Sequence, residues 1–468
     1  MAILREACGV IGICGHQEAA TRAYYGLFAL QHRGQESAGM AVVDAHGNLI
    51  SHKGMGLTAE VFSTGDLDRL KTHMALGHVR YSTHGASDVS NAQPLTFKYA
   101  HGQIALAHNG NIANTDTLKR QLEKDGSIFQ STSDTETVAH LMARAGDLPP
   151  HEALQKAVSQ LRGGFALLAL TPDCLMGARD PHGIRPLVMG RLNNGSYVLA
   201  SESCALDVVG AQVIREVEGG EMVVLRPHQE PVSIRFAPRG QEALCMFEYI
   251  YFARPDSDIR GANVHLVRKE LGRVLAREHP AEADLVTGVP DSSISAAAGY
   301  AEEAGIPYEL GLIKNRYIGR TFIQPDQSER DLGVKLKLNP IRAVVEGKRV
   351  ALIDDSIVRG TTSRYLVRLM RGVGAREVHL RIASPPYRNA CYYGIDTSAA
   401  GDLLAARAQV EQIRELVGAD SLGYISWEGT IRATGGKEGT FCMACFDGFY
   451  PAGTPEDESR KEILREQG

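Results

Sequence analysis

The spacing of apolar residues divides the chain into two halves with different patterns. In the first half, short apolar runs are broken by glycine, which predicts strands joined by tight turns. Apolar residues three to four positions apart predict helices over 135–144 and 150–161. We therefore expect packed sheets covered by helices, ending at a boundary near 226–245. The clearest strand-like runs are 9–15, 40–43, 104–110 and 163–171.

The second half has a pattern of strand followed by helix. The apolar run 283–289 precedes a helical stretch over 292–305, and the run 349–355 precedes another over 361–374. Alternation of this kind predicts a parallel, doubly wound sheet. The second of these helices is expected to bury Leu366, Leu369, Met370 and Val373.

Length and composition exclude several classes of protein. A chain of 468 residues, 44% hydrophobic and 22% charged, is long enough for two domains. Its net charge of -5 offers no broad basic field for nucleic acid, so we expect small molecules or copies of itself as partners. No apolar run approaches the roughly 18 residues that span a bilayer, and residues 1–7 lack the apolar stretch of a secretory signal. We expect a cytoplasmic protein, in which suggestively spaced cysteines are nucleophiles or metal ligands and not disulfides.

Residues 350–363 (VALIDDSIVRGTTS) have the pattern of a phosphate-binding turn. An apolar strand ends at the paired acids Asp354 and Asp355, a loop with Gly360 follows, and a helix is expected to start near Thr361. The first turn of a helix presents unpaired N–H groups, and small loop residues let a phosphate approach them. The acids suit ribose hydroxyls or a magnesium ion bridging sugar and pyrophosphate. The alternative is an ordinary strand end before a capped helix.

Two other segments could complete such a site. In residues 288–296 (GVPDSSISA), Ser292 and Ser293 open a helix where an anion could dock, although the same pattern is a common helix cap. A later glycine-containing stretch carries Lys314 and Arg316. A cationic loop that closes over the site would neutralise a leaving pyrophosphate and exclude water, whereas the alternative is a solvated basic loop.

The first half carries a candidate nucleophile. Cys8 precedes a glycine and a strand-like run, seven residues from the start of the chain. If residues 1–7 are removed as a propeptide, Cys8 gains a free α-amino group that can assist thiolate attack on an amide. The first half would then be an N-terminal nucleophile glutaminase. The alternative is that Cys8 is a small buried apolar residue that opens a strand.

Four motifs in the first half resemble, in the same order, those of class II glutamine amidotransferases. Taken one at a time, each could be a surface turn, but four in this order are not expected by chance. The motifs are QHRGQESAG at 31–39, GHVRYSTHG at 77–85, AHNGNIAN at 107–114 and STSDTET at 131–137.

This resemblance implies a role for each matching residue. Arg80 would bind the α-carboxylate of glutamine and Asp134 its ammonium group. The side-chain amide of Asn109 and the N–H of Gly110 would stabilise the oxyanion that forms during hydrolysis. Arg33 would support the glutamine pocket.

The second half resembles the type I phosphoribosyltransferases. With the phrase EYIYFARPDS at 248–257, the chain is similar to the glutamine phosphoribosylpyrophosphate (PRPP) amidotransferases from Cys8 to about Tyr450. The resemblance implies magnesium ligands at Ser292, Asp354 and Asp355. The PRPP-binding residues that it implies are Asp291, Ser292, Ser293, Lys314, Arg316, Asp354, Asp355, Ser356, Arg359, Gly360, Thr361 and Thr362.

Four cysteines extend the resemblance. Cys442 and Cys445 form a CxxC, which by itself fits zinc, a redox pair, an iron–sulfur cluster or no ligand at all. One branch of the family has a cleavable propeptide and a structural 4Fe-4S cluster. In their local sequence contexts Cys245, Cys391, Cys442 and Cys445 match the ligands of that cluster. A structural cluster would attach the C-terminal segment to both domains.

The family resemblance implies that glutamine, PRPP and water are converted to 5-phosphoribosylamine, pyrophosphate and glutamate, the first step of purine synthesis, with ammonia passing between the sites. It implies an N-terminal nucleophile (Ntn) αββα glutaminase over 8–235, a phosphoribosyltransferase domain over 236–450 and a tail over 451–468. It also implies a homotetramer inhibited by purine nucleotides. The alternatives are a glutamine-fed transferase for another phosphosugar and a nucleotide-sensing protein without turnover.

Overall fold

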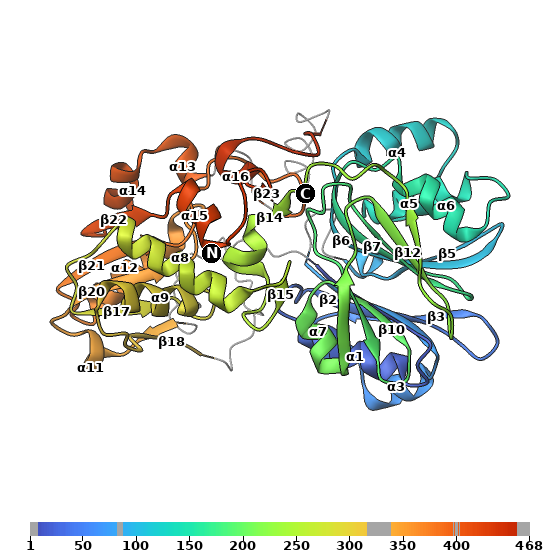
Figure 1. The fold of residues 1–468 in the computed structure, drawn as a ribbon, viewed down its shortest axis with the longest axis horizontal. Coiled ribbons are helices and arrows are strands. Elements are labelled where there is room, and N and C mark those ends of the chain that lie inside the picture. Colours follow the sequence, from blue (N-terminus) through green and yellow to red (C-terminus); the bar gives the residue numbers. More distant parts are fainter. Residues whose placement is uncertain are drawn as a thin grey trace.

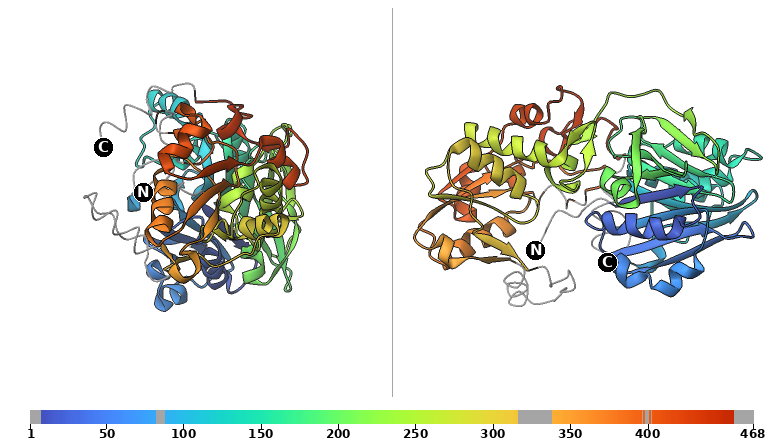
Figure 2. Two further views of the ribbon diagram at one scale, coloured as in Figure 1. Left: turned by 90° about the vertical axis from the view of Figure 1, so that its left-hand side faces the viewer. Right: turned by 60° about the horizontal axis from the view of Figure 1, so that its bottom comes forward.

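The computed structural model describes residues 8–81, 88–315, 338–395, 397, 401 and 403–455. Residues 1–7, Arg316 and most of the basic stretch 314–325 lie outside these ranges. Figure 1 shows two bodies side by side, one formed by the first half of the chain and the other by the second. They also lie side by side in the right-hand view of Figure 2, whereas in the left-hand view the second half lies in front of the first.

The first half consists of two antiparallel sheets packed face to face. In spatial order, one contains β11 (Ala211–Glu216), β9 (Val188–Leu192), β10 (Tyr197–Ala200), β1 (Gly9–Cys14), β4 (Met74–Arg80), β2 (Ser37–Val43) and β3 (Leu49–Met55). The other contains β13 (Val232–Arg235), β12 (Glu221–Leu225), β8 (Leu175–Arg179), β7 (Gly163–Leu170), β6 (Gly102–Ile112) and β5 (Leu95–Tyr99).

Helices cover both outer faces of these sheets. The first sheet packs against α1 (Ala19–Ala29) and α7 (Ser203–Val209). The second packs against α4 (Thr115–Lys124), α5 (Thr135–Ala143) and α6 (Pro150–Val158). Short helices α2 (Thr58–Val61) and α3 (Thr64–Arg69) follow β3. The predicted sheets covered by helices are confirmed as an αββα sandwich.

Alternation along β1 shows how the sequence builds these layers. Val10 and Cys14 face the second sheet, whereas Ile11 and Ile13 face the helices. Since side chains alternate sides along a strand, an apolar strand buried on both faces fits only between two covered layers. The entry of β1 into this core sets the position of the residue before it, Cys8.

The second half is built on a parallel sheet of β17 (Leu285–Gly288), β20 (Arg349–Asp354), β21 (Glu377–Ile382) and β22 (Ser421–Tyr424). Helices α8 (Val264–Glu278) and α9 (Ile294–Ala304) cover one face of this sheet. Helices α12 (Thr361–Gly372) and α14 (Val410–Val417) cover the other. The predicted doubly wound sheet is confirmed.

The winding direction of this sheet reverses between β17 and β20. After α9 the chain returns along the free side of β17, where Tyr308 forms a parallel bridge with Val286. After β20 it crosses by α12, on the opposite face, to β21. Ligands of such sheets bind at the carboxyl ends of the strands where this reversal occurs. Both strand-to-helix turns singled out from the sequence lie there.

Short elements complete both halves and join them. None of the helices described here combines the length and the apolar character that a membrane span requires. The remaining elements are η1 (Val89–Asn91), β14 (Leu244–Cys245), η2 (Glu248–Phe252), β15 (Asp258–Ile259), β16 (Ala262–Asn263), β18 (Leu312–Lys314), β19 (Leu338–Pro340), α11 (Arg342–Val345), α13 (Leu404–Arg407), α15 (Trp427–Ala433), β23 (Phe441–Cys442) and α16 (Ala444–Asp447).

Candidate active sites in the two halves

Cys8 lies at the start of β1, beside the end of β4. Its side chain is buried, and its Sγ donates a hydrogen bond to the Tyr81 carbonyl oxygen at 3.4 Å. Burial raises the pKa of the Cys8 thiol, whereas the Tyr81 hydrogen bond and the charge of Arg80 lower it. A thiol in this setting needs a base to become a nucleophile.

The two residues expected to bind glutamine lie near this thiol. Arg80 and Asp134 both act electrostatically on the pKa of Cys8, with opposite signs. Arg80 Nη1 donates to Glu36 Oε1 at 2.8 Å, and Asp134 Oδ2 accepts from the Ile112 N–H at 3.0 Å. The sequence argument did not single out Glu36, although it lies within the first motif. The site therefore presents a cation and an anion, as an amino-acid ligand requires.

Asn109 and Gly110 lie on β6, one strand from the edge of the second sheet. Asn109 is fully buried, and neither atom of its side-chain amide has a hydrogen-bond partner in the described part of the protein. Such an amide is costly to bury unless it serves a ligand. Gly110 has a φ of 131°, and a Cβ there would lie 2.0 Å from the Gly164 carbonyl oxygen. Only glycine fits at position 110.

Arg33 is fully buried and makes ion pairs with two carboxylates. Its Nη1 lies 2.6 Å from Glu202 Oε1, and its Nη2 lies 2.8 Å from Glu248 Oε1. Its Nε donates to the Cys8 carbonyl oxygen at 3.0 Å. Arg33 therefore contacts the backbone of the candidate nucleophile, and its guanidinium is occupied by protein groups. Sequence reasoning missed both glutamates because each is distant along the chain.

The two strand-to-helix turns of the second half meet at the switch point. Asp354 is the last residue of β20 and Asp355 follows it; both are buried. The Ser292 hydroxyl donates to Asp355 Oδ2 at 2.5 Å, and the Ser293 hydroxyl donates to Asp354 Oδ1 at 3.4 Å. The Ser356 hydroxyl donates to Asp355 Oδ1 at 2.6 Å. Burial and the neighbouring charge of Asp355 raise the pKa of Asp354 well above its usual range.

The start of α12 faces this edge of the sheet. Gly360 precedes the helix with a φ of 75°, a left-handed conformation that favours glycine. The N–H groups of Thr361 and Thr362 belong to the first turn, where helices bind phosphate. Lys314 pairs with Asp291 at 2.6 Å, which joins β18 to the turn after β17. Arg359 is exposed in the loop that precedes the helix.

The four matching cysteines gather where the halves meet. Cys245 and Cys442 are register partners in the parallel pair β14–β23. Burial raises the pKa of Cys245 to about 12 and those of Cys442 and Cys445 above their usual value, and Cys391 acts electrostatically on all three. In the described part of the chain, no three His, Cys, Asp or Glu side chains are arranged to hold a metal ion.

Each half matches the model of a known domain. A glutamine amidotransferase domain matches residues 78–208, and a phosphoribosyl transferase domain matches residues 265–399. With the αββα sandwich and the doubly wound sheet, these matches define the chain as a glutamine-dependent phosphoribosyltransferase.

Similarity over almost the whole chain narrows this class to one family. The amidophosphoribosyltransferase of Bacillus subtilis is 52% identical, with 97% of this chain and 96% of that protein covered. That of Methanothermobacter thermautotrophicus is 48% identical, with 99% and 98% covered. A solved B. subtilis glutamine PRPP amidotransferase, complexed with ADP and GMP, superposes with a TM-score of 0.90 at 52% identity, over 96% of this chain and 98% of that one. The chain belongs to the amidophosphoribosyltransferase family.

Proposed function

We propose that the two sites act in series to convert glutamine, PRPP and water to 5-phosphoribosylamine, pyrophosphate and glutamate, the opening step of purine synthesis. The observation that carries this proposal is that one chain holds a buried thiol beside Arg80 and Asp134 and, at the switch point of a second domain, the Asp354–Asp355 pair. Ammonia released into water would become ammonium, which has no lone pair for attack. It therefore passes between the sites through an enclosed route.

In the first site, Cys8 is the nucleophile. Once the propeptide 1–7 is removed, its α-amino group takes the thiol proton and the sulfur attacks the amide carbon of glutamine. Asn109 and Gly110 donate to the resulting oxyanion, while Arg80 and Asp134 hold the carboxylate and the ammonium group. The α-ammonium group then returns this proton to the amide nitrogen as the carbon–nitrogen bond breaks, ammonia leaves, and water hydrolyses the thioester to glutamate and the free thiol.

In the second site, the first turn of α12 holds the 5-phosphate of PRPP. Ser356, Arg359 and the N–H groups of Thr361 and Thr362 bind it, while the 291–293 turn, Lys314 and Arg316 bind the pyrophosphate. Ammonia attacks ribose C1 as the bond to pyrophosphate breaks. The oxygens of Ser292, Asp354 and Asp355 suit Mg²⁺, which would supply positive charge to the leaving pyrophosphate.

We also propose that Cys245, Cys391, Cys442 and Cys445 are the ligands of a 4Fe-4S cluster. The four cysteines come from three segments, Cys245 and Cys442 are register partners, and thiolates are the usual ligands of such clusters, although the thiols as they lie in this structure are not arranged to hold a metal ion. A bound cluster would supply a covalent link between β14, the 391 segment and α16. Iron and sulfide analysis together with N-terminal sequencing tests the cluster and the propeptide. Protein without iron that still begins at Met1 and is active would contradict both.

We further propose domain limits of 8–235 and 236–450, a tail over 451–468, a homotetramer and inhibition by purine nucleotides. The B. subtilis structure complexed with ADP and GMP supports nucleotides as regulators. Light scattering and inhibition assays with ADP and GMP test the last two points. A monomer that neither nucleotide inhibits would contradict them.

The direct test of the function is pyrophosphate release from PRPP and Mg²⁺ by the purified protein. We expect release with either glutamine or ammonia as nitrogen donor. Release from another phosphosugar alone would favour a different glutamine-fed transferase. Binding of nucleotides without turnover of either donor would favour a nucleotide-sensing protein.

Replacing Asp354 by asparagine should strongly lower the synthesis rate and stabilise the fold at neutral pH. Removing a group that only hydrogen-bonds to a metal ligand costs up to about 100-fold in activity. Removing a magnesium ligand itself should therefore lower the synthesis rate at least about 100-fold. Because the folded-state pKa of Asp354 is raised, stability falls as pH rises above the unfolded value of about 4. Asparagine cannot ionise, so the variant avoids this fall in stability. In Mg²⁺-free buffer the Tm of the variant should exceed the wild-type Tm at pH 7 but not at pH 4.

Asp284→Asn is the control, and its effect on Tm at pH 7 should be opposite to that of Asp354→Asn. The hydrogen bonds from Arg349 lower the pKa of Asp284 to about 2, so its ionised form stabilises the protein above pH 4. This variant should lower Tm at pH 7 and keep synthesis, because Asp284 lies at the far end of β17. A lower Tm for Asp354→Asn at pH 7 would show that its carboxylate is not destabilising.

A further inference from the structure

Four fully buried charged side chains lie where the two halves meet: Arg33, Arg185, Glu202 and Glu248. Arg33 pairs with both glutamates, and Arg185 Nη1 lies 3.3 Å from Glu248 Oε1. Two positive and two negative charges balance within the group. These residues form an ion network that is shielded from water. The network includes Arg33, which donates a hydrogen bond to the Cys8 carbonyl oxygen.

The geometry of Arg33 connects Glu248 to Cys8. Arg33 Nη1 and Nη2 donate to Glu248 Oε2 and Oε1, both at 2.8 Å, so the two groups form a pair of parallel hydrogen bonds. Because a guanidinium is rigid and planar, these bonds also fix the direction of its Nε–H. That N–H donates to the Cys8 carbonyl oxygen at 3.0 Å. The orientation of Glu248 therefore sets the position of the Cys8 backbone.

Glu248 is itself held by the second half of the molecule. It begins η2, three residues after Cys245. Arg185, which also contacts its carboxylate, donates from Nε and Nη2 to the Tyr393 carbonyl oxygen at 2.9 and 2.7 Å. Two segments outside the αββα sandwich thus determine where Glu248 lies.

Stability does not explain this network. Buried ion pairs can often be replaced by apolar side chains without loss of stability, because desolvation offsets their attraction. What they supply is a fixed geometry. We propose that Glu248, acting through Arg33, is a positioning residue for the Cys8 nucleophile, so that glutamine hydrolysis depends on how the second half is seated. This inference rests on the proposed function, in which Cys8 attacks glutamine.

Glu248→Gln tests the inference with a nearly isosteric change. The amide places an NH₂ group against one N–H of Arg33, which breaks one of the two parallel bonds. We expect kcat for glutamine hydrolysis to fall about 10- to 100-fold, since a displacement of about 1 Å can cost 10²-fold. The KM for glutamine should be almost unchanged because Arg80 and Asp134 remain in place. Ammonia-dependent synthesis should also be almost unchanged and reports that the same sample is folded.

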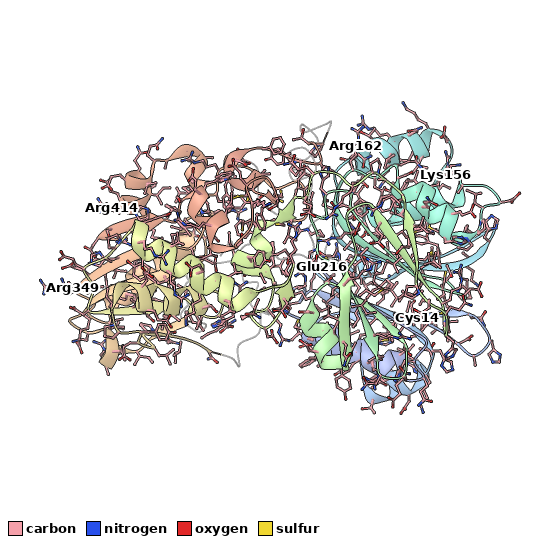
Figure 3. All side chains as sticks on the ribbon, viewed as in Figure 1. Cys14, Lys156, Arg162, Glu216, Arg349 and Arg414 are labelled. Atoms are coloured by element: carbon pink, nitrogen blue, oxygen red, sulfur yellow. The ribbon has the colours of Figure 1, made fainter. Side chains whose placement is uncertain are left out.

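Glu216→Gln is the matched control at the same junction, where Figure 3 labels Glu216 between the two bodies. Glu216 accepts from Arg179 at 3.0 Å and from the Arg260 N–H at 2.5 Å, and among the described residues it has no bond to Arg33. Both activities should stay at the wild-type level in this variant.

A double variant, Arg33→Met with Glu248→Met, removes one charge of each sign and covers the case in which Glu248→Gln does not fold. It should show the same selective loss of glutamine hydrolysis. Wild-type hydrolysis, or an equal loss of both activities, in whichever variant folds would overturn the inference. Normal hydrolysis by Cys8→Ala would instead overturn the proposed function.

Discussion

Cys8→Ala should lose glutamine-dependent synthesis and keep ammonia-dependent synthesis. Without the thiol no thioester can form, so we expect the glutamine-dependent rate to fall at least about 10⁴-fold; removing a catalytic nucleophile can cost about 10⁶-fold. The second site lies in another body, with Asp354 and Asp355 at its switch point, and should accept ammonia from solution as before. The measurement is pyrophosphate release from PRPP with each nitrogen donor, together with glutamate release.

Cys14→Ala is the matched control for this prediction. Cys14 is a second buried thiol, at the end of β1, and it packs in the core between the two sheets. This variant should keep both activities and lose only some packing energy. If Cys8→Ala retained glutamine-dependent synthesis, or if neither protein used ammonia, the assignment of the two sites would be wrong.

Arg33→Met should be among the most destabilising single substitutions in the first half. Removing one partner of a buried ion pair typically costs about 3–5 kcal/mol. Here Glu202 keeps His32 at 2.7 Å and Glu248 keeps Arg185 at 3.3 Å, so we expect the lower end, about 3 kcal/mol. The urea midpoint, followed by circular dichroism, should fall by about 1–2 M.

Arg69→Met is the surface counterpart of that change. Arg69 pairs with Asp66, but its side chain is 72% exposed, and exposed ion pairs contribute at most about 1 kcal/mol. Its urea midpoint should stay close to the wild-type value. Equal midpoints for the two variants would mean that leaving Glu202 and Glu248 without Arg33 costs no more than breaking a surface pair.

Periodicity was enough to predict the layers of the fold because it depends only on neighbours along the chain. The apolar run before Asp354 became β20, and the helical stretch after Gly360 became α12. The prediction of which face of α12 is buried was less accurate. Ser363, Leu366, Val367 and Met370 are buried, whereas Leu369 and Val373 are only half-buried. Which apolar side chains of a helix are buried depends on the part of the sheet against which the helix packs, and not only on the sequence of the helix.

Local motifs located the candidate site residues for a similar reason. The Asp354–Asp355 pair and the Ser292–Ser293 turn each have a recognisable pattern, and the switch point then brings them together. The contact between Arg33 and Glu248 has no such pattern because it joins residues 215 positions apart. Residue spacing contains no information on a contact that arises only when two domains meet.

The parallel pairing of β14 with β23 has a consequence for the time at which the enzyme becomes competent. Leu244 and Cys245 align with Phe441 and Cys442, and Arg185 donates to the carbonyl oxygen of Tyr393, so the junction uses segments that are synthesised long after Cys8. Under the role proposed for Glu248, the position of Cys8 depends on these later segments. A growing polypeptide would then not consume glutamine before the domain that uses the ammonia has been synthesised.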